Sequence, residues 1–297
     1  MTEPFRAFQV RVRRLARLAP SFVRVTFTGD DLDRFADNGL DQRIKVVLPA
    51  PRGGVAAFPS GPGWHARWRA QPDAERNPMR TYTVRAVRPA AREVDVDFVV
   101  HGDGGPAARW VATVAPGGAA VLLGPDAAHP GPHGGVEFRP PAGCGTVLLA
   151  GDETAVPAIV SILDRLPAGL SGEALMEVPC REDVLPVTVP DAMNVCWLPR
   201  DGAARGSLLV PQVRAAAGRL LPRRAPAPVP DEDDRAAGEL WEVPEEAAPA
   251  GQAYAWLAGE ASLIRTLRRY LVAERGMDRR AVAFMGYWRQ GRAEGAA

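Results

Sequence analysis

The hydrophobic pattern of this chain changes near residue 146, and that change constrains its fold more than any other feature. Before it, apolar and polar residues alternate in short runs such as 22–28 and 93–100, which is typical of half-buried β-strands. After it, continuous apolar runs alternate with helical periodicity, which indicates parallel strands covered on both faces. Because 297 residues also exceed one average domain, we predict two domains, at 1–140 and 141–297.

The first domain is predicted to be a small antiparallel β-barrel. Its expected strands are 5–12, 22–28, 44–49, 80–87, 93–100 and 119–123. Many short strands with a single late helix, after residue 105, are typical of such barrels. The segment 50–78 is rich in Pro, Gly, Trp and Arg, and we predict that it forms an ordered loop without a regular element.

The second domain is predicted to be a Rossmann-like α/β unit. Its expected strands are 147–150, 174–178, 194–198, 254–258 and 282–285, and its expected helices are 155–166, 208–220 and 261–274. Strands and helices that alternate in this way build a parallel sheet, whose ligands bind beyond the carboxyl ends of the strands. The turn GDETA at 151–155 is not a G-x-G-x-x-G fingerprint, so spacing alone does not establish a dinucleotide site.

An insertion at 222–250 interrupts the second domain. Pro and Ala alternate in it and acidic residues follow, so it cannot bury enough apolar surface to order itself. We predict a partly mobile segment, in which LWEVP at 240–244 docks as an anchored patch.

One barrel strand carries residues suited to a nucleotide. In MRTYTVR at 79–85, Arg80 is suited to phosphate oxygens, and Tyr82 can lie flat against a planar heterocycle. Taken alone, this stretch is better explained as an ordinary exposed barrel strand. Another predicted barrel strand, 93–100, is followed directly by HGDGGPAARW at 101–110, where Pro106 begins a short helix. Glycines before a helix N-terminus form a phosphate site, so the two motifs together favour a flavin nucleotide.

The chain resembles the siderophore-interacting proteins, which are FAD-containing ferric-siderophore reductases related to the ferredoxin-reductase superfamily. The matching segments are 80–85, 97–110, 117–119, 124–125, 151–159, 256–260 and 286–291. They occur in order over nearly the whole chain. The resemblance implies that the barrel carries FAD and that the second domain binds NADPH or NADH.

The resemblance also implies roles for particular residues. The implied cofactor-binding residues of the barrel are Arg80, Thr81, Tyr82, Thr83, Asp97, Val99, His101, Gly104, Gly105, Pro106, Ala107 and Trp110. Those of the second domain are Gly151, Asp152, Glu153, Thr154, Ala155, Arg200, Ala258, Gly259, Glu260, Tyr287 and Trp288. Lys45 and Arg289 are implied to bind the siderophore, with Arg265 as a weaker candidate.

Some of these residues have alternative interpretations. Asp152 and Glu153 resemble a catalytic carboxylate pair but fit a turn better, with Thr154 as a candidate N-cap. Arg265 lies on one helical face with Arg268 and Arg269, and such a stripe is by default solvated surface. No catalytic acid or base and no metal ligand is expected, because the reaction that the resemblance implies is electron transfer.

The implied reaction is the reduction of a ferric siderophore by NAD(P)H through FAD. A hydride carries two electrons and Fe(III) accepts one, and a flavin can pass electrons on singly. Siderophore oxygens are hard donors that hold Fe(II) less strongly, so reduction releases iron. Three alternatives remain: a general FAD-dependent flavin or ferric reductase, a reductase supplied by a ferredoxin, and, less favoured, a siderophore carrier without enzymatic activity.

The identity of the nicotinamide nucleotide is suggested only weakly. In folds like that of ferredoxin reductase, the loop after the third strand of this domain commonly contacts the 2′-phosphate, and Arg200 occupies that place with Arg205 nearby. An acidic residue such as Glu177 would instead favour NAD. We therefore expect a modest preference for NADPH.

Net charge, hydropathy and cysteine spacing give no support for several other classes of function. A net charge of +1 gives no reason to expect nucleic acid as a partner. No apolar window approaches the length of a membrane span or follows a basic N-terminal segment, so neither membrane insertion nor a signal peptide is expected. Three cysteines without CxxC spacing suggest a reducing, cytoplasmic location.

Overall fold

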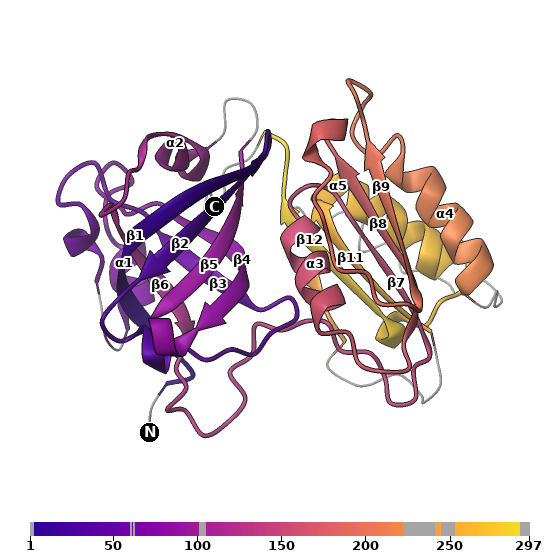
Figure 1. Ribbon diagram of the computed structural model, residues 1–297, viewed down its shortest axis with the longest axis horizontal. Helices are drawn as coiled ribbons and strands as arrows, with labels where there is room; N and C mark the ends of the chain where they lie inside the picture. Colours follow the sequence, from indigo (N-terminus) through magenta and orange to yellow (C-terminus); the bar gives the residue numbers. More distant parts are fainter. Residues whose placement is uncertain are drawn as a thin grey trace. The chain divides into compact units, whose positions relative to one another are not determined.

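The structure, a computed structural model, describes residues 3–59, 61, 63–100, 105–221, 241–244 and 253–291 (Figure 1). They divide into two compact units, Met1–Val136 and Glu137–Ala297. Each unit has its own hydrophobic core. In the described part of the chain, no helix is long and apolar enough to cross a membrane.

Unit 1 is a closed antiparallel barrel, as predicted. Its strands are β1 (Phe5–Ala19), β2 (Phe22–Thr28), β3 (Arg43–Val47), β4 (Met79–Arg88), β5 (Glu93–Val99) and β6 (Ala119–Pro125). They pair in the order β1-β2-β5-β4-β3-β6, and β6 returns to β1. Closure gives every strand two neighbours, so the sheet has no open edge.

Helix α2 (Pro106–Thr113) packs its apolar face against the barrel core. Val111 belongs to the same buried cluster as Phe27 and Phe98. The Trp110 ring stacks on Phe27, with centroids 6.2 Å apart and planes 9° from parallel. The aromatic contacts fix the helix relative to β5 and therefore fix where its N-terminus lies.

The segment 50–78 is not without regular elements, which corrects the sequence prediction. It contains a short 3-10 turn and helix α1 (Trp64–Arg69). Trp68 is buried against Val47 and Leu123, and its Nε1 donates to the Asn77 carbonyl at 3.0 Å. A helix this short has little stability of its own. Burial of Trp68 against other parts of the barrel therefore stabilises helix α1, and the local sequence does not predict this helix.

The outer face of β5 carries three buried carboxylates paired with arginines. Glu93, Asp95 and Asp97 are each at most 5% exposed. Arg88 bonds both Glu93 and Asp95, at 2.8 and 2.6 Å, and Arg24 binds Asp97 with two bonds of 2.7 and 2.8 Å. Because strand residues two apart share a face, the alternation in EVDVDFV stacks these pairs in a row.

This row predicts how acid affects unit 1. The hydrogen bond from Arg14, opposed by burial, holds the pKa of Glu93 below its ordinary 4.5. Burial alone would raise the pKa of Asp95, but bonds from Arg88 and Thr26 outweigh it and lower the pKa below 3.8. Both carboxylates thus bind protons more weakly in the folded protein than in the unfolded chain. Their ionised forms therefore stabilise the fold at pH values above their ordinary pKa, and this stabilisation is lost as the pH falls through their lowered pKa in the folded protein.

The melting temperature of unit 1 should therefore fall steeply below about pH 4 and change little between about pH 5 and 7. Calorimetric melts across this range measure it. Glu93→Gln should melt lower than wild type at pH 7 but depend less on acid. A wild-type melting temperature that holds steady to pH 3 would contradict this prediction.

Unit 2 is built on a six-stranded sheet in the order β10-β12-β11-β7-β8-β9. The strands are β7 (Thr146–Gly151), β8 (Ser171–Val178), β9 (Met193–Pro199), β10 (Trp241–Glu242), β11 (Tyr254–Glu260) and β12 (Val282–Trp288). All pairs are parallel except that of β10 with β12. The predicted Rossmann-like parallel sheet is confirmed.

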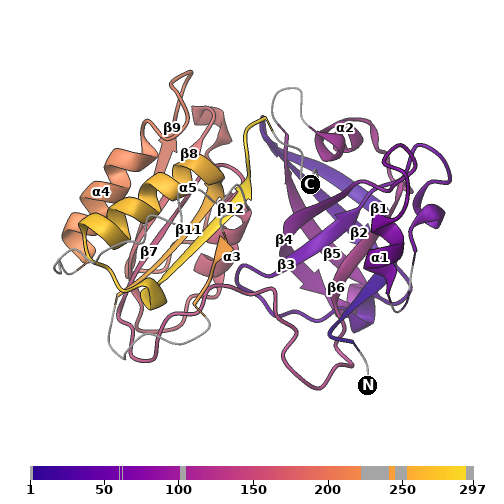
Figure 2. The same ribbon diagram turned by 180° about the vertical axis from the view of Figure 1, so that it is seen from behind.

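Helices cover both faces of this sheet. Helix α3 (Val156–Asp164) lies on one face, whereas α4 (Leu209–Leu220) and α5 (Ala261–Arg268) lie on the other (Figures 1 and 2). The chain continues from α5 as one π-helical stretch, Arg269–Glu274. Every residue of β11 is buried, which agrees with the continuous apolar run that predicted a strand covered on both sides.

Strand β10 docks part of the predicted insertion onto the edge of the sheet. Trp241 stacks on Tyr287, with centroids 5.9 Å apart, and Glu242 bonds Arg268 at 2.8 Å. The docked patch predicted at 240–244 is thereby confirmed for Trp241 and Glu242. The remainder of 222–250 lies outside the described residues, apart from Val243 and Pro244.

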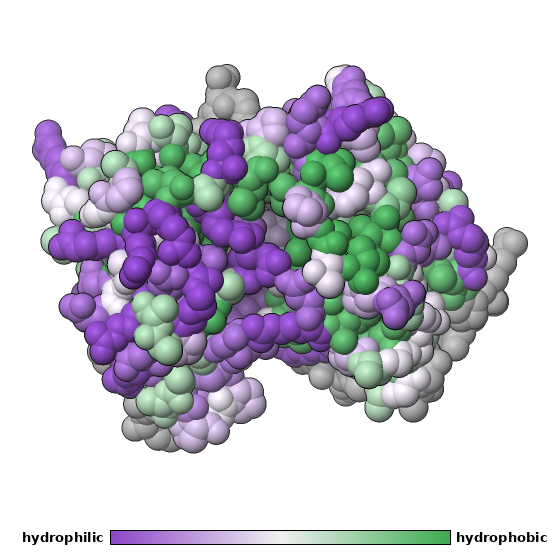
Figure 3. All heavy atoms as spheres, viewed as in Figure 1, coloured by the Kyte–Doolittle hydropathy of each residue, from purple (hydrophilic) through white to green (hydrophobic). Residues whose placement is uncertain are grey.

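The connection from β8 to β9 contains only a 3-10 turn, Arg181–Asp183, and no α-helix. Figure 3 shows apolar side chains gathered on the face of unit 2 that carries α3 and this connection. Val184 and Val189, both in the connection, are 39% and 41% exposed. Two apolar side chains of this extended segment are therefore partly open to solvent.

Candidate functional site

Strand β4 presents Arg80 and Tyr82 on one face. Arg80 pairs with Val46 and Tyr82 with Ile44, and both partners belong to the barrel core. The Tyr82 ring lies 4.2 Å from the ring of Phe98. Arg80 is half-buried, and its Nη1 donates to the Met79 carbonyl at 2.8 Å. A cation and an aromatic ring therefore lie side by side, as the alternation of the motif predicts.

The two threonines of the motif lie on the opposite face of β4. Thr81 pairs with Lys45, whose Nζ donates to the Thr81 Oγ1 at 2.5 Å. Thr83 pairs with Arg43 and is 7% exposed. The four residues implied to bind the cofactor together are thus divided between two faces, and Lys45 accompanies the threonines.

The pairing of β4 with β5 brings Arg80 close to the carboxyl end of β5, the strand that precedes α2 in the chain. Val84 pairs with Val96 in antiparallel register, and the ring contact of Tyr82 with Phe98 continues that register. Arg80 therefore lies near the carboxyl end of β5, where half-buried Val99 leads toward α2. His101 and Gly104, also implied to bind the cofactor, lie outside the described residues.

Helix α2 begins at a glycine with open space in front of it. Gly105 is the N-cap, Pro106 opens the helix, and no described side chain caps it. A Cβ added to Gly105 would meet no atom within 4 Å. The first N–H groups of a helix attract anions. Arg80, the Tyr82 ring and this helix start therefore fit the phosphates and the flat ring of FAD.

Asp97, Ala107 and Trp110, which the resemblance implies to be cofactor-binding, each have contacts within the barrel. Asp97 is 4% exposed and holds Arg24 in the row of ion pairs on β5. Trp110 packs on Phe27 and Phe98, while Ala107 is buried in the barrel core. These contacts give each of them a structural role. Their roles toward FAD stay predictions.

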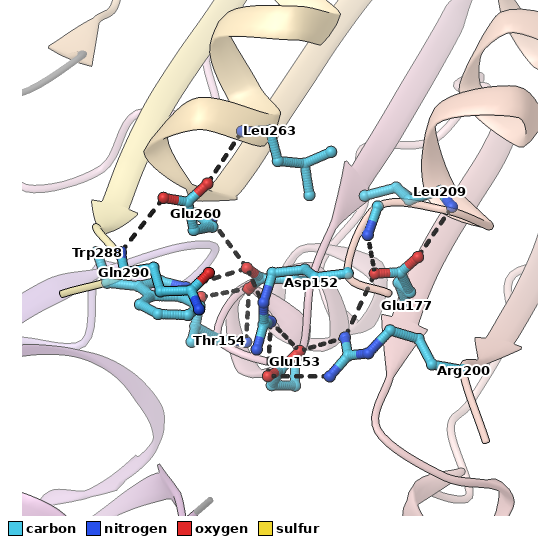
Figure 4. Close-up of polar contacts among 12 residues, drawn as sticks. Asp152, Glu153, Thr154, Glu177, Arg200, Leu209, Glu260, Leu263, Trp288 and Gln290 are labelled. Atoms are coloured by element: carbon cyan, nitrogen blue, oxygen red, sulfur yellow. Dashed lines mark hydrogen bonds and ion pairs between the residues drawn. The ribbon is translucent and has the colours of Figure 1, made fainter. Parts of the chain in front are cut away.

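In unit 2, three strand ends meet at Asp152. This fully buried carboxylate follows β7. Its Oδ1 accepts from the N and Oγ1 of Thr154 at 2.9 and 2.5 Å. Its Oδ2 accepts from the Glu260 N at 2.8 Å and the Trp288 Nε1 at 3.0 Å, at the ends of β11 and β12 (Figure 4). Burial, and then the charge of Glu153, raise its pKa above the ordinary value.

Thr154 is not the predicted N-cap. Helix α3 begins at Val156 with Ala155 as its N-cap, without a side-chain cap bond. The Thr154 hydroxyl instead donates to Asp152, because the turn after Gly151 directs both its donors toward that carboxylate.

Glu153 binds two arginines. Arg205 Nη1 lies 2.7 Å from both of its carboxylate oxygens, and Arg200 Nη1 lies 3.0 Å from one. Burial alone would raise the pKa of Glu153, but the bond from Arg200 and the charge of Arg205 outweigh it and lower the pKa. Glu153 is therefore a buried anion shared between two cations.

Glu177, at the end of β8, caps helix α4. It is fully buried and accepts from the backbone N–H groups of Gly206, Leu208 and Leu209 at 2.8, 3.1 and 3.1 Å. It also binds Arg200 Nη1 at 3.3 Å (Figure 4). The carboxylate of Glu177 is therefore already bound at a helix N-terminus.

Glu260 caps α5 in the same way. Its side chain accepts from the Ser262 and Leu263 N–H groups at 2.8 and 3.1 Å, from the Ser262 hydroxyl, and from the Gln290 N at 3.3 Å. Burial opposes ionisation, but these bonds together lower the pKa of Glu260. Two of the helix N-termini at this edge are therefore occupied by carboxylates of the chain itself.

Two glycines let the strand ends approach. Gly259 has φ of +148°, and a Cβ there would lie 2.8 Å from the Asp152 Cγ. A Cβ on Gly151 would lie 2.4 Å from the Ala155 Cβ and 2.5 Å from the carbonyl oxygen of buried Ala258. The GDETA turn thus uses glycine for close packing.

Arg200 is bound within the protein. Its side chain is 9% exposed and pairs with Glu153 and Glu177. A 2′-phosphate would have to compete with both carboxylates. Its role as a phosphate ligand stays a prediction.

The basic residues considered for siderophore binding have different surroundings. Arg289 is exposed and Arg265 half-buried, and neither forms an ion pair among the described residues. Arg268 is 4% exposed and binds Glu242, so Arg265, Arg268 and Arg269 do not form a solvated stripe. Helical spacing did not reveal this, because β10 comes from a distant segment.

Comparisons with known proteins agree with this architecture. The profile of the siderophore-interacting FAD-binding domain matches residues 11–129, and that of the siderophore-interacting protein matches 145–291. An uncharacterized protein of Mycobacterium tuberculosis is 36% identical over 294 residues, covering 98% of this chain and 92% of the relative.

Two further relatives have descriptive names. The ferric vibriobactin reductase ViuB of Vibrio cholerae is 31% identical over 280 residues, covering 94% of this chain and 88% of the relative. A siderophore utilization protein from T. fusca has a solved structure with a TM-score of 0.73 at 28% identity, covering 99% of this chain and 96% of that one. Ferredoxin reductases align at 13–14% identity, and their likeness concerns the fold alone.

Proposed function

The protein belongs to the siderophore-interacting protein family as an FAD-dependent oxidoreductase, and we propose that it reduces ferric siderophores with electrons from a nicotinamide nucleotide. The observation that supports the proposal is that Arg80 and Tyr82 share one face of β4, beside the end of β5, the strand that precedes α2. ViuB, which is named a ferric vibriobactin reductase, supports the choice of substrate.

The barrel residues have distinct roles in this proposal. Arg80 and the N–H groups at the start of α2 bind the FAD phosphates. The Tyr82 ring orients the flat flavin ring, and Phe98 supports it from the side. When bound, FAD accepts two electrons from a hydride and releases them singly.

The carboxyl edge of the unit 2 sheet receives the nicotinamide nucleotide. Asp152 holds Trp288 by its Nε1, so the position of the indole is defined before any ligand arrives. Glu153, Arg200 and Arg205 form the charged part of this edge.

The stoichiometry follows from electron counting. Oxidation of one NAD(P)H yields NAD(P)+, one proton and two electrons, which reduce two ferric complexes to ferrous complexes. The hard siderophore oxygens hold Fe(II) less strongly, so no protein side chain has to extract the iron.

A panel experiment tests the proposed function. The FAD-loaded protein is mixed anaerobically with ferric siderophores, and NADH, NADPH and reduced ferredoxin are each offered as donor. We expect two Fe(II) per nicotinamide oxidised, counted with a ferrous chelator. Flavin bleaching by NAD(P)H without any Fe(II) would contradict siderophore reduction and favour a general flavin reductase.

A ferredoxin donor is the second candidate, and one observation favours it. Glu177 and Glu260 already occupy the N-termini of α4 and α5, where a dinucleotide phosphate would otherwise bind. Fe(II) production with reduced ferredoxin but with neither nucleotide would support this candidate.

Substitutions of Lys45 and Arg289 test the attraction of anionic substrates. Lys45→Ala and Arg289→Ala should each raise KM for an anionic ferric siderophore about five- to tenfold, and salt should reduce the difference. Flavin reduction by the donor should remain as in wild type. Steady-state kinetics at low and high salt measure the effect.

An uncharged ferric complex and the exposed Arg269→Ala variant serve as controls. Equal losses on charged and uncharged complexes would show structural damage and contradict charge attraction.

A further inference from the structure

Arg205 contacts both the carboxylates of the unit 2 edge and the indole of Trp288. Its Nη1 lies 2.7 Å from both Glu153 oxygens and 3.6 Å from an Asp152 oxygen. Its Cζ lies 4.5 Å from the centroid of the Trp288 ring. A planar cation therefore covers one face of the indole at the carboxyl edge of the sheet.

Arg205 can leave this position at lower cost than Arg200. Glu153 retains Arg200 when Arg205 departs. Asp152 loses the more distant cation at 3.6 Å but keeps its hydrogen bonds from Thr154, the Glu260 N and the Trp288 Nε1. The Arg205 side chain is 22% exposed, compared with 9% for Arg200. Arg200 also binds Glu177, so its departure would disturb two buried carboxylates.

A phosphate that reaches this edge meets few other donors in the charged network. Glu177 and Glu260 already accept from the first N–H groups of α4 and α5. Arg205 is the more exposed of the two network arginines, and a guanidinium binds phosphate as readily as carboxylate.

The face of Trp288 under Arg205 suits a flat ring. The Asp152 carboxylate accepts a hydrogen bond from the indole Nε1, so the ring stays in place when Arg205 moves away. The reduced nicotinamide of the donor is a flat, uncharged ring that can stack on an indole face. The oxidised ring formed after electron transfer is a planar cation, as a guanidinium is, and is attracted to the same face.

We propose that Arg205 is an exchangeable residue of the nucleotide site. Without nucleotide it binds Glu153 and covers Trp288. When the nucleotide binds, Arg205 moves to one of its phosphates, and the nicotinamide ring takes its place on Trp288. The inference rests on the proposed function, in which a nicotinamide nucleotide is the donor.

Ligand fragments separate the two parts of this exchange. The FAD-loaded full-length protein is titrated with 1-methylnicotinamide, which has the cationic ring without phosphate, and with ADP-ribose, which has the phosphates without the ring. Arg205→Ala should bind 1-methylnicotinamide about threefold tighter or more, because Trp288 is uncovered. It should bind ADP-ribose about tenfold more weakly, because a phosphate contact is lost. Calorimetry or ligand-detected NMR measures both constants.

Two variants make the test specific. Arg219→Ala removes another arginine–glutamate pair of unit 2, with Glu173 near the amino end of β8, and should change neither affinity. Adding Trp288→Leu to Arg205→Ala should abolish the gain for 1-methylnicotinamide. Thermal melts confirm that each variant is folded.

The outcomes are distinguishable. Changes of opposite sign for the two fragments support the exchange. Unchanged affinities, or equal losses for both fragments, overturn it while NAD+ still binds wild type. If neither NADH nor NADPH binds wild type, the nucleotide donor itself is refuted and the exchange with it.

Discussion

Replacement of Arg200 by alanine should lower the free energy of unfolding of unit 2 by about 3–5 kcal/mol. The Arg200 side chain is 9% exposed and binds two fully buried carboxylates, Glu153 and Glu177. Its removal leaves Glu177 with backbone N–H partners but no cation. Calorimetry of the full-length protein measures the effect, and the transition of unit 2 should shift while that of unit 1 does not.

Two comparisons sharpen this prediction. Arg219→Ala removes an exposed arginine from its ion pair with Glu173. It should lower the melting temperature less than Arg200→Ala does, because Arg219 binds one carboxylate whereas Arg200 binds two. Adding Glu177→Gln to Arg200→Ala should cost less than the sum of the single changes, because the unpaired charge is removed as well. If Arg200→Ala melts like wild type yet slows flavin reduction by NADPH and spares NADH, Arg200 is the 2′-phosphate ligand that its order in the chain predicts.

The second large effect concerns FAD. Arg80→Ala should bind FAD about 10- to 150-fold more weakly, which corresponds to the loss of a charge-assisted phosphate bond of about 1.5–3 kcal/mol. Arg80 is half-buried on the face of β4 that carries Tyr82. The protein should copurify with little FAD, and titration of the apoprotein followed by flavin fluorescence gives the affinity.

Arg17→Ala is the matched control, because it removes an exposed arginine of β1 that bonds only the Pro20 carbonyl among the described residues. Tyr82→Ala should change mainly the absorbance envelope of the bound flavin. FAD affinity in Arg80→Ala equal to that of wild type would show that the phosphate site lies elsewhere.

Regular patterns in the sequence predicted the folds of both units. Alternation with period two predicted five of the six barrel strands to within a few residues, because one face of each contacts the core. β1 extends seven residues beyond the predicted end, to Ala19. Continuous apolar runs predicted the parallel sheet, because β7, β8 and β11 are covered on both faces and so need apolar residues at successive positions. Helix α1 was missed because only its packing on Val47 and Leu123 stabilises it.

The alternation in β4 also determined that Arg80 and Tyr82 share a face, and it placed Thr81 and Thr83 on the other. The neighbours of those faces could not be predicted from the motif. That Lys45 donates to Thr81 depends on the register of β3 with β4, and that register depends on closure of the whole barrel.

The charged network of unit 2 was decided by tertiary structure alone. Glu153, Glu177 and Arg205 lie far apart in the chain, and the motif around Glu153 does not reveal which charges it meets. They meet because the order β11-β7-β8-β9 brings the carboxyl ends of these strands to one edge. Local sequence determines whether a residue ends a strand, whereas the order of strands in the sheet determines which charges it meets there. The order of strands matters most for stability at a buried edge, because each carboxylate there needs a hydrogen-bonding or charged partner once water is excluded.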